Sequence, residues 1–214
     1  MKTTRILSLI TVFVALIANF GTLSAQEQTT LKHFKTLKGH SYTPNSVSWN
    51  ADGSCLASGA NDGIVIIWDA KSGTKLKTFE GHSGKVNSVA WSADGRYLAS
   101  GSWDETIIIW DSKSGEKLQT FEGCSDGVYS VAWSADGSYL ASGLGNGNLV
   151  IWDSKTGERL QTLEGHSAVV NSVSWSPDGS CLASGSFDHN VIIWDSKSGE
   201  RLQTFEGQIG RAHV

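Results

Sequence analysis

The sequence repeats itself every 42 residues. A Gly-His pair stands at positions 39–40, 81–82 and 165–166, and Gly123-Cys124 takes the same phase between them. A Trp-Asp pair recurs in step at 68–69, 110–111, 152–153 and 194–195. A chain with such a period folds as a row of equal units, each burying its apolar surface against its neighbours.

Each unit has the pattern of four short strands. The second unit predicts strands at residues 86–91, 97–100, 106–110 and 117–121. Asp94-Gly95 lies between the first two and is a strong signal for a tight hairpin turn. The third segment is apolar without interruption, which is typical of a strand covered on both faces. The fourth alternates polar and apolar residues, which indicates a half-exposed edge strand.

A period of this length with these two pairs is a propeller-blade signature, and the chain therefore resembles the WD-repeat β-propeller family over about residues 31–207. The resemblance implies an all-β fold of four four-stranded blades. Rings in this family favour more blades than four, so we expect an incomplete ring, an open arc. The end blades of such an arc should expose apolar side chains, among them Val65, Ile67, Ile192 and Ile193.

The first 25 residues are typical of a signal peptide. Lys2 and Arg5 precede an apolar run at 6–20, and a small residue, Ala25, precedes the expected cleavage point. The alternative is a membrane anchor, although the run is shorter than the roughly 20 residues a spanning helix needs. We expect a secreted or periplasmic chain with no membrane insertion after cleavage, then a linker and a leading outer strand at 26–38.

Four blades are expected at 39–206, followed by an irregular tail at 207–214. Gln208 stands where the repeat requires a His, and residues 209–214 resemble no other part of the chain. One way to encode residues 209–214 resembles the start of a common sequencing adapter, so we interpret the tail as an artefact that interrupts a longer reading frame. The alternative is a short natural tail.

Three units carry a His, a Ser, an Asp and a Trp in phase. These sets are His40, Ser58, Asp62 and Trp68; His82, Ser100, Asp104 and Trp110; and His166, Ser184, Asp188 and Trp194. Ser, His and Asp are the parts of a nucleophilic triad, but an enzyme needs one such site and not three. The resemblance implies a structural tetrad in each blade, with Asp accepting from His and His bridging to Ser and to the Trp N–H.

The third unit keeps Ser142 and Trp152 but has Cys124 in place of His and Asn146 in place of Asp. The joint loss fits two residues that are each other's partners, because a buried Asp without its His would be an uncompensated charge. We therefore expect this blade to be the least rigid of the four.

Three positions per unit vary where the tetrad is constant. In the family the matching positions surround the mouth of the central channel, so we predict a ligand-binding top face there. It comprises Thr43, Asn45, Asn61, Lys85, Asn87, Trp103, Tyr129, Val169, Asn171 and Phe187. Trp103 is the only Trp that does not recur. It is either a binding anchor or a ring packed over a neighbouring loop.

Composition narrows the remaining choices. The net charge is −4, which gives no basic surface for nucleic acid. The three cysteines are too few for a disulfide framework and are expected to be unpaired, and the scattered His predict no metal or other cofactor. The leading interpretation is a non-enzymatic scaffold that binds a protein or peptide and self-associates through its end blades. Alternatives are the propeller part of a larger exported enzyme, and a glycan or cell-surface adhesion module.

Overall fold

A computed structural model describes residues 36–207 of this chain, which form four antiparallel sheets of four strands each. The first sheet consists of β1 (Pro44–Trp49), β2 (Cys55–Ala60), β3 (Val65–Asp69) and β4 (Lys75–Phe79). The second consists of β5 (Val86–Trp91), β6 (Tyr97–Ser102), β7 (Ile107–Asp111) and β8 (Lys117–Phe121). The third consists of β9 (Val128–Trp133), β10 (Tyr139–Leu144), β11 (Leu149–Asp153) and β12 (Arg159–Leu163). The fourth consists of β13 (Val170–Trp175), β14 (Cys181–Ser186), β15 (Asn190–Asp195) and β16 (Arg201–Glu206).

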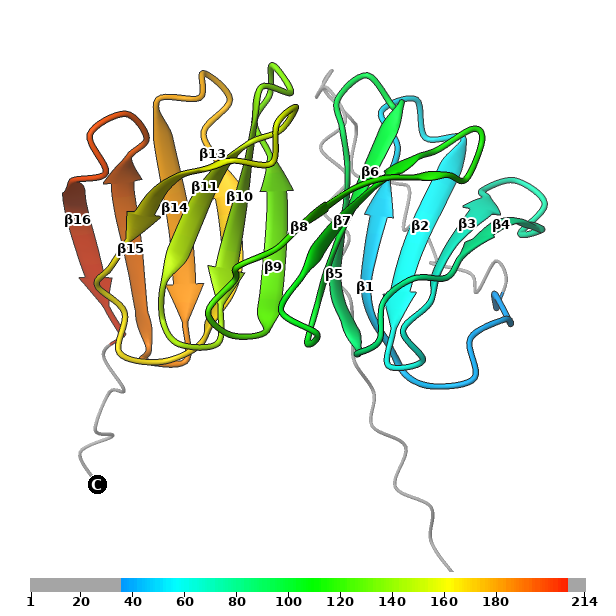
Figure 1. The fold of residues 1–214 in the computed structure, drawn as a ribbon, viewed down its shortest axis with the longest axis horizontal. Helices are drawn as coiled ribbons and strands as arrows, with labels where there is room; N and C mark the ends of the chain where they lie inside the picture. The colour runs from blue at the N-terminus through cyan, green and yellow to red at the C-terminus, as the bar shows by residue number, and fades with distance from the viewer. Residues whose placement is uncertain (1–35, 208–214) are drawn as a thin grey trace, which may run out of the picture. The chain divides into compact units, whose positions relative to one another are not determined.

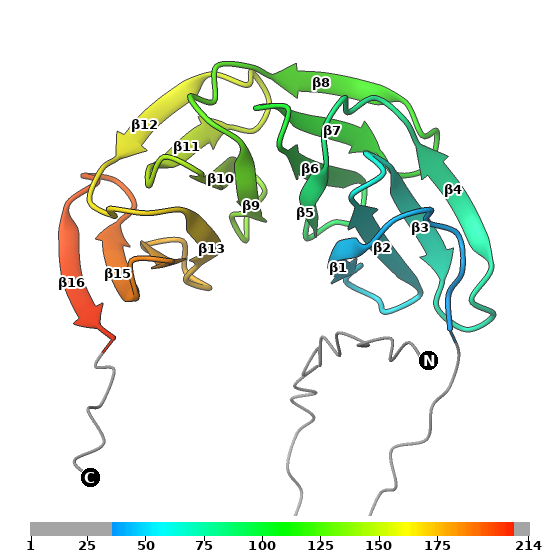
Figure 2. The same ribbon diagram turned by 90° about the horizontal axis from the view of Figure 1, so that it is seen from below.

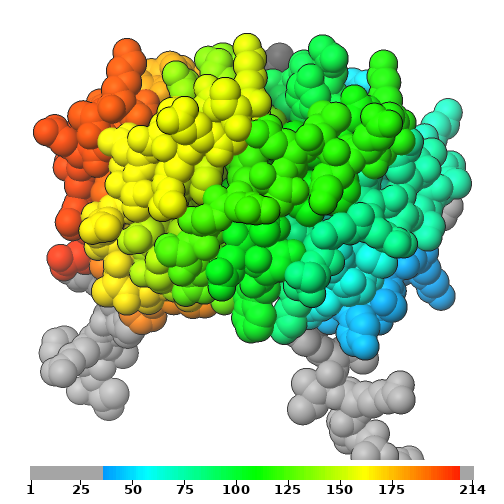
Figure 3. Space-filling view, in the orientation of Figure 1, coloured from blue at the N-terminus to red at the C-terminus, as the bar shows by residue number. Residues whose placement is uncertain are grey.

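Within each sheet the strands lie in chain order (Figure 1). The sheets stand side by side in a curved row, with β1, β5, β9 and β13 on the inside of the curve and β4, β8, β12 and β16 on the outside (Figure 2). Atoms of successive sheets meet without a gap along the outer side (Figure 3). The row does not close on itself, so the expected all-β incomplete propeller is confirmed.

Short-range turn chemistry sets the strand ends. At Gly95 the backbone has φ +68°, a conformation that glycine adopts without strain. Asp94 accepts hydrogen bonds from Ser92 Oγ (2.6 Å) and Arg96 N (3.0 Å), which closes the hairpin between β5 and β6. The observed strands agree with the expected ones to within two residues. Thr106, which was expected to begin a strand, instead bonds Asp104.

Three apolar clusters fill the spaces between successive sheets. The cluster between the second and third sheets, for example, joins Ile107, Ile109 and Phe121 to Val131 and Trp152, and all five side chains are buried. Clusters built from matching positions of the repeat lie between the first and second sheets and between the third and fourth. The core of the fold is therefore a set of repeated joints between blades.

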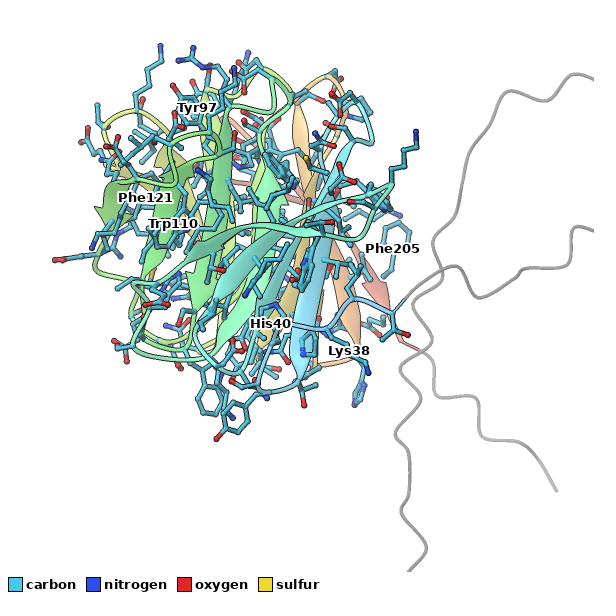
Figure 4. All side chains as sticks on the ribbon, turned by 90° about the vertical axis from the view of Figure 1, so that its right-hand side faces the viewer. Lys38, His40, Tyr97, Trp110, Phe121 and Phe205 are labelled. Carbon is cyan, nitrogen blue, oxygen red and sulfur yellow. The ribbon has the colours of Figure 1, made fainter. Side chains whose placement is uncertain are left out.

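The prediction of which apolar side chains the end blades expose was mostly wrong. Val65, Ile67 and Ile192 are buried, and Ile193 is half-buried. Val65 and Ile67 point toward the second sheet, and Ile192 belongs to the cluster shared with the third. The exposed side chains are others: Val47 and Trp49 on the first sheet, and Val191 and Phe205 on the fourth. The ring of Phe205 projects from β16 (Figure 4).

The predicted leader at 1–25 and the tail at 208–214 lie outside the described residues. Of the predicted leading strand, residues 36–38 are described and form no strand. Within residues 36–207, no helix is long and apolar enough to cross a membrane.

Candidate functional site

The loop that enters each innermost strand is tied to its blade by a chain of side-chain hydrogen bonds. In the second blade, Trp110 Nε1 lies 2.8 Å from Ser100 Oγ, and Ser100 Oγ lies 2.7 Å from His82 Nε2. His82 Nδ1 lies 2.9 Å from Asp104 Oδ2. The first blade has the same chain through His40, which lies beside the strands of its sheet (Figure 4), and the fourth has it through His166.

The chemistry of the four groups fixes the direction of these bonds. A carboxylate only accepts, so His82 Nδ1 carries the hydrogen that bonds Asp104. In the neutral imidazole, His82 Nε2 is then an acceptor and receives the Ser100 hydroxyl hydrogen, while Ser100 Oγ accepts from the Trp110 indole. Ser100, and not His82, is therefore the partner of the indole, which corrects the expected bridge from His to Trp.

The carboxylate also holds the loop backbone. Ser83 N donates to Asp104 Oδ2 at 2.9 Å, and Thr106 Oγ1 donates to Asp104 Oδ1 at 2.7 Å. Burial alone would raise the pKa of Asp104, but these bonds and the bond from His82 outweigh it, and the pKa lies below its usual value. Burial lowers the pKa of His82, against the opposing charge of Asp104. Both shifts favour neutral His beside ionised Asp.

Ser, His and Asp thus stand in the geometric order of a catalytic triad, but solvent does not reach the hydroxyl. Ser100 is 0% exposed and Ser184 1%. The Ser100 hydroxyl is buried between His82 and Trp110, so a substrate atom has no access to it. The arrangement serves to hold the loop against the blade.

The third blade keeps only the last bond of this chain, from Trp152 Nε1 to Ser142 Oγ at 2.9 Å. Asn146 is exposed and donates to Ser125 Oγ. Cys124 is buried, which raises the pKa of its thiol to about 12.

The backbone of the loop at Gly123 in the third blade also differs from that of the other three blades. Gly123 has φ +84°, whereas Gly39, Gly81 and Gly165 do not adopt a positive φ. In those three the glycine lies against the tip of the tetrad Trp ring, where an added Cβ would come within 2.9 Å or less. Gly123 has no such contact with Trp152, so the loop of the third blade is shaped differently.

The structure brings six of the predicted top-face positions together in three pairs, and two glycines take the matching places in the third blade. Two loops of each blade are joined by one backbone hydrogen bond of 2.9–3.0 Å between the variable positions. The bonds run from Asn61 N to Thr43 O, Trp103 N to Lys85 O, Gly145 N to Gly127 O, and Phe187 N to Val169 O. Side chains at these positions therefore share one end of the blades, next to the tetrad loops.

Trp103 is the centre of a small cluster at this end. Its side chain is 52% exposed, and Lys85 Nζ lies 4.5 Å from the centre of its ring. The ring also meets Tyr129 edge-on at 6.5 Å and stands over Gly127 of the next blade. Beside it a hollow of about 430 Å³ is lined by Asn61, Lys85, Trp103, Asp104 and neighbouring loop residues. Phe187, at the position matching Trp103, is 59% exposed.

Asn45 and Asn87 have a structural role that the sequence did not reveal. The register of their strands shifts at these residues, and each side chain reaches the next blade. Asn45 Nδ2 donates to Val86 O and Asn87 Nδ2 donates to Val128 O, both at 2.9 Å. Asn45 also donates to Asn61 Oδ1 at 2.8 Å. Asn45 and Asn87 are therefore partly joint residues, and not surface positions alone as predicted.

Grooves recur at the opposite ends of the blades, beside the Asp-Gly hairpins. Two of them, about 380 and 490 Å³, each contain a Tyr stacked on a Trp of the next blade. The pairs are Tyr97 with Trp133 and Tyr139 with Trp175, with ring centres 6.5 and 6.2 Å apart. These Trp residues recur at the repeat period without belonging to a tetrad, and that recurrence was the signal available in the sequence.

The three cysteines, all within the described residues, carry free thiols. Among residues 36–207 no group of three or more His, Cys, Asp or Glu side chains is placed to hold a metal ion.

The family described as "WDR19 first beta-propeller" has a sequence model that matches residues 45–209. The chain belongs to this family of WD-repeat β-propellers. WD-repeat propellers generally act as scaffolds for protein interaction.

Curated WD-repeat relatives match over one repeat length. WD repeat-containing protein slp1 of Schizosaccharomyces pombe is 54% identical over 37 residues, which are 17% of this chain and 8% of the relative. Anaphase-promoting complex subunit cdc20 of Dictyostelium discoideum is 50% identical over 40 residues, 19% of this chain and 8% of the relative. Small ribosomal subunit protein RACK1 of Medicago sativa is 44% identical over 48 residues, which are 22% of this chain and 15% of the relative. The matches thus span a small fraction of these relatives' lengths.

Proposed function

We propose that this WD-repeat protein is a non-enzymatic binding module for a protein or peptide, with its contact surface at the end of the blades that carries Trp103. The observation that carries the proposal is a half-exposed Trp beside a hollow, with a Lys amino group over its ring. Trp, Tyr and Arg dominate the residues that contribute most to protein interfaces. Two relatives bear the names of an anaphase-promoting complex subunit and a small ribosomal subunit protein, which agrees with a role in assemblies.

Trp103 has a packing role as well, because its ring stands over Gly127 and meets Tyr129. Packing alone leaves half of the side chain in water. A partner that covers the ring would bury the exposed half together with Lys85, and burial of a cation–aromatic pair away from water strengthens it. We propose Lys85, Trp103 and Tyr129 as the centre of the contact surface, with Phe187 two blades away at its periphery.

Capture of partners on the immobilised chain tests the proposal. Trp103→Ala should weaken capture by about 2 kcal/mol or more, a typical cost for an interface anchor. Leu118→Ala is the matched control, since Leu118 is 48% exposed on the outer strand β8. The control should bind as the unchanged chain does, and both variants should stay folded, with only a small loss of thermal stability for Trp103→Ala because its ring also packs on Gly127 and Tyr129. Equal capture by all three chains would show that Trp103 serves packing alone.

We further propose that the chain is exported to the periplasm or outside the cell, as the pattern of residues 1–25 suggests. Expression in a secreting host followed by intact-mass measurement tests this. A product that begins at Gln26 is expected, and an uncleaved chain that stays with the cytoplasm would contradict export.

A further inference from the structure

The three joints between blades use the same polar contacts. A backbone N–H of each innermost strand donates to a Ser hydroxyl of the preceding blade, always at 3.1 Å: Val89 N to Ser46 Oγ, Val131 N to Ser88 Oγ, and Val173 N to Ser130 Oγ. An indole N–H crosses each joint in the same sense, also at 3.1 Å: Trp91 Nε1 to Ser48 O, Trp133 Nε1 to Ala90 O, and Trp175 Nε1 to Ala132 O. Each joint thus has a donor side and an acceptor side.

The apolar contacts are directional too. Val86 packs directly on Gly59 of the preceding blade, so that an added Cβ at Gly59 would overlap it. Val128 on Gly101 and Val170 on Gly143 repeat this contact. The glycine belongs to the acceptor side in every case.

Each end of the described row presents one half of this joint. The donor side of the first blade, the leading face, consists of Pro44, Val47 and Trp49. Val47 is 46% exposed, whereas its counterparts Val89, Val131 and Val173 are 5–7% exposed inside joints. Within residues 36–207, neither Val47 N nor Trp49 Nε1 makes the inter-blade bond of its counterparts.

The acceptor side of the fourth blade, the trailing face, consists of Asn171, Ser172, Ser174, Gly185, Val191 and Phe205. Val191 is 43% exposed, and its counterparts Val65, Ile107 and Leu149 are 0% exposed. Phe205 is 49% exposed, and the matching Phe79, Phe121 and Leu163 are 1–2% exposed. A Cβ added at Gly185 would meet only Asn171 and Ser172, at 3.9 Å, so the place that a residue of a following blade fills elsewhere is open.

We propose that the trailing face of one copy of this chain packs against the leading face of a second copy, head to tail, as a fourth joint of the same kind. Ser172 Oγ accepts from Val47 N of the second copy, Ser174 O accepts from its Trp49 Nε1, and its Pro44 covers Gly185. Asn171 donates to the Pro44 carbonyl, as Asn45 and Asn87 donate to the valines of the next blade. The two faces match because the blades on either side have nearly the same sequence.

A head-to-tail contact makes a prediction that a face-to-face contact does not. A copy blocked on its leading face offers only a trailing face, so it has no partner among copies like itself. A copy blocked on its trailing face offers only a leading face, so it likewise has no partner among copies like itself. The two blocked forms nevertheless complement each other through the one joint that remains intact.

The experiment is light scattering coupled to size-exclusion chromatography of the 214-residue chain at tens of micromolar. Val47→Glu blocks the leading face, Val191→Glu blocks the trailing face, and Leu118→Glu is the control with the same charge change on an exposed outer strand. We expect the unchanged chain and the control to have the mass of two or more copies. Each blocked variant should be monomeric, and their equimolar mixture should recover a two-copy species.

A monomeric unchanged chain overturns the proposal, because the faces are then free or covered within one copy. Association that either single block leaves intact, or that Leu118→Glu abolishes, overturns it as well. Circular dichroism verifies that each variant is folded. If a substitution alters the spectrum, Trp49→Glu and Phe205→Glu replace it on the leading and trailing faces.

Discussion

Trp110 Nε1 donates to Ser100 Oγ over 2.8 Å between two side chains that are 2% and 0% exposed. Ser100→Ala would leave the indole N–H and His82 Nε2 buried without partners. We expect a loss of about 1–3 kcal/mol in the free energy of unfolding, measured by urea denaturation. Ser142→Ala is the matched control, because in the third blade only Trp152 bonds this hydroxyl. It should cost less, and equal losses would contradict the chain of bonds described here.

Acid should destabilise the protein in two stages. The pKa of His82 is lowered from 6.5, so the unfolded chain binds a proton before the folded one does, and stability should fall as the pH drops below about 6.5. The pKa values of Asp62, Asp104 and Asp188 are lowered from 3.8. Their contribution is present above that pH and should be lost as the pH falls through their folded values. Urea midpoints from pH 8 to pH 3 test this. His82→Asn should flatten the first stage, and an unchanged first stage would contradict it.

The third blade should exchange its loop amides faster than the others. Ser41, Ser83 and Ser167 each donate their backbone N–H to the tetrad Asp at 2.9–3.0 Å. The matching Ser125 follows Cys124, and Asn146 bonds its hydroxyl instead. Hydrogen exchange followed by mass spectrometry should show Ser125 and the Trp152 region exchanging before Ser83 and the Trp110 region. Equal protection would mean that the tetrad does not set local rigidity.

Restoring the missing pair should stabilise the third blade. The double variant Cys124→His with Asn146→Asp supplies both partners at the positions where His82 and Asp104 bond at 2.9 Å. We expect a gain of about 1 kcal/mol or more if the loop at Gly123 returns to the shape of the others. Asn146→Asp alone should gain nothing, since it adds a carboxylate without its His. A double-mutant cycle measures the coupling, and strictly additive effects would contradict it.

The strands and the tetrads could be predicted because their signals are local or periodic. Asp-Gly turns fix hairpins, and in-phase His, Ser, Asp and Trp mark one repeated contact. The sequence did not reveal which side chains of the third strand of each blade point toward which neighbouring blade. Residues 65–68 are apolar without alternation, so the sequence pattern does not separate the two faces of this strand. In the structure, Val65 and Ile67 point toward the next blade, whereas Ile66 and Trp68 point away from it.

Other features depended on backbone detail. The bulge that sends the Asn87 side chain to the next blade leaves no mark in the polar–apolar pattern, so Asn87 was counted as a variable surface position. The sequence located the change of residues in the third unit, but it did not show the positive φ that Gly123 adopts there. The grouping of Lys85, Trp103 and Tyr129 required the positions of two blades at once.

The close packing of Val86 on the Gly59 backbone, repeated at Gly101 and Gly143, gives all three joints the same contact. A duplication or deletion of one 42-residue unit brings together the same donor and acceptor sides, so the new joint between blades needs no change of sequence. Gene length can thus drift in whole units while each internal boundary remains satisfied. Sequence differences between units are then confined to the few loop positions beside the tetrads. One unit can carry a Trp there, as the second does at Trp103, without disturbing the others.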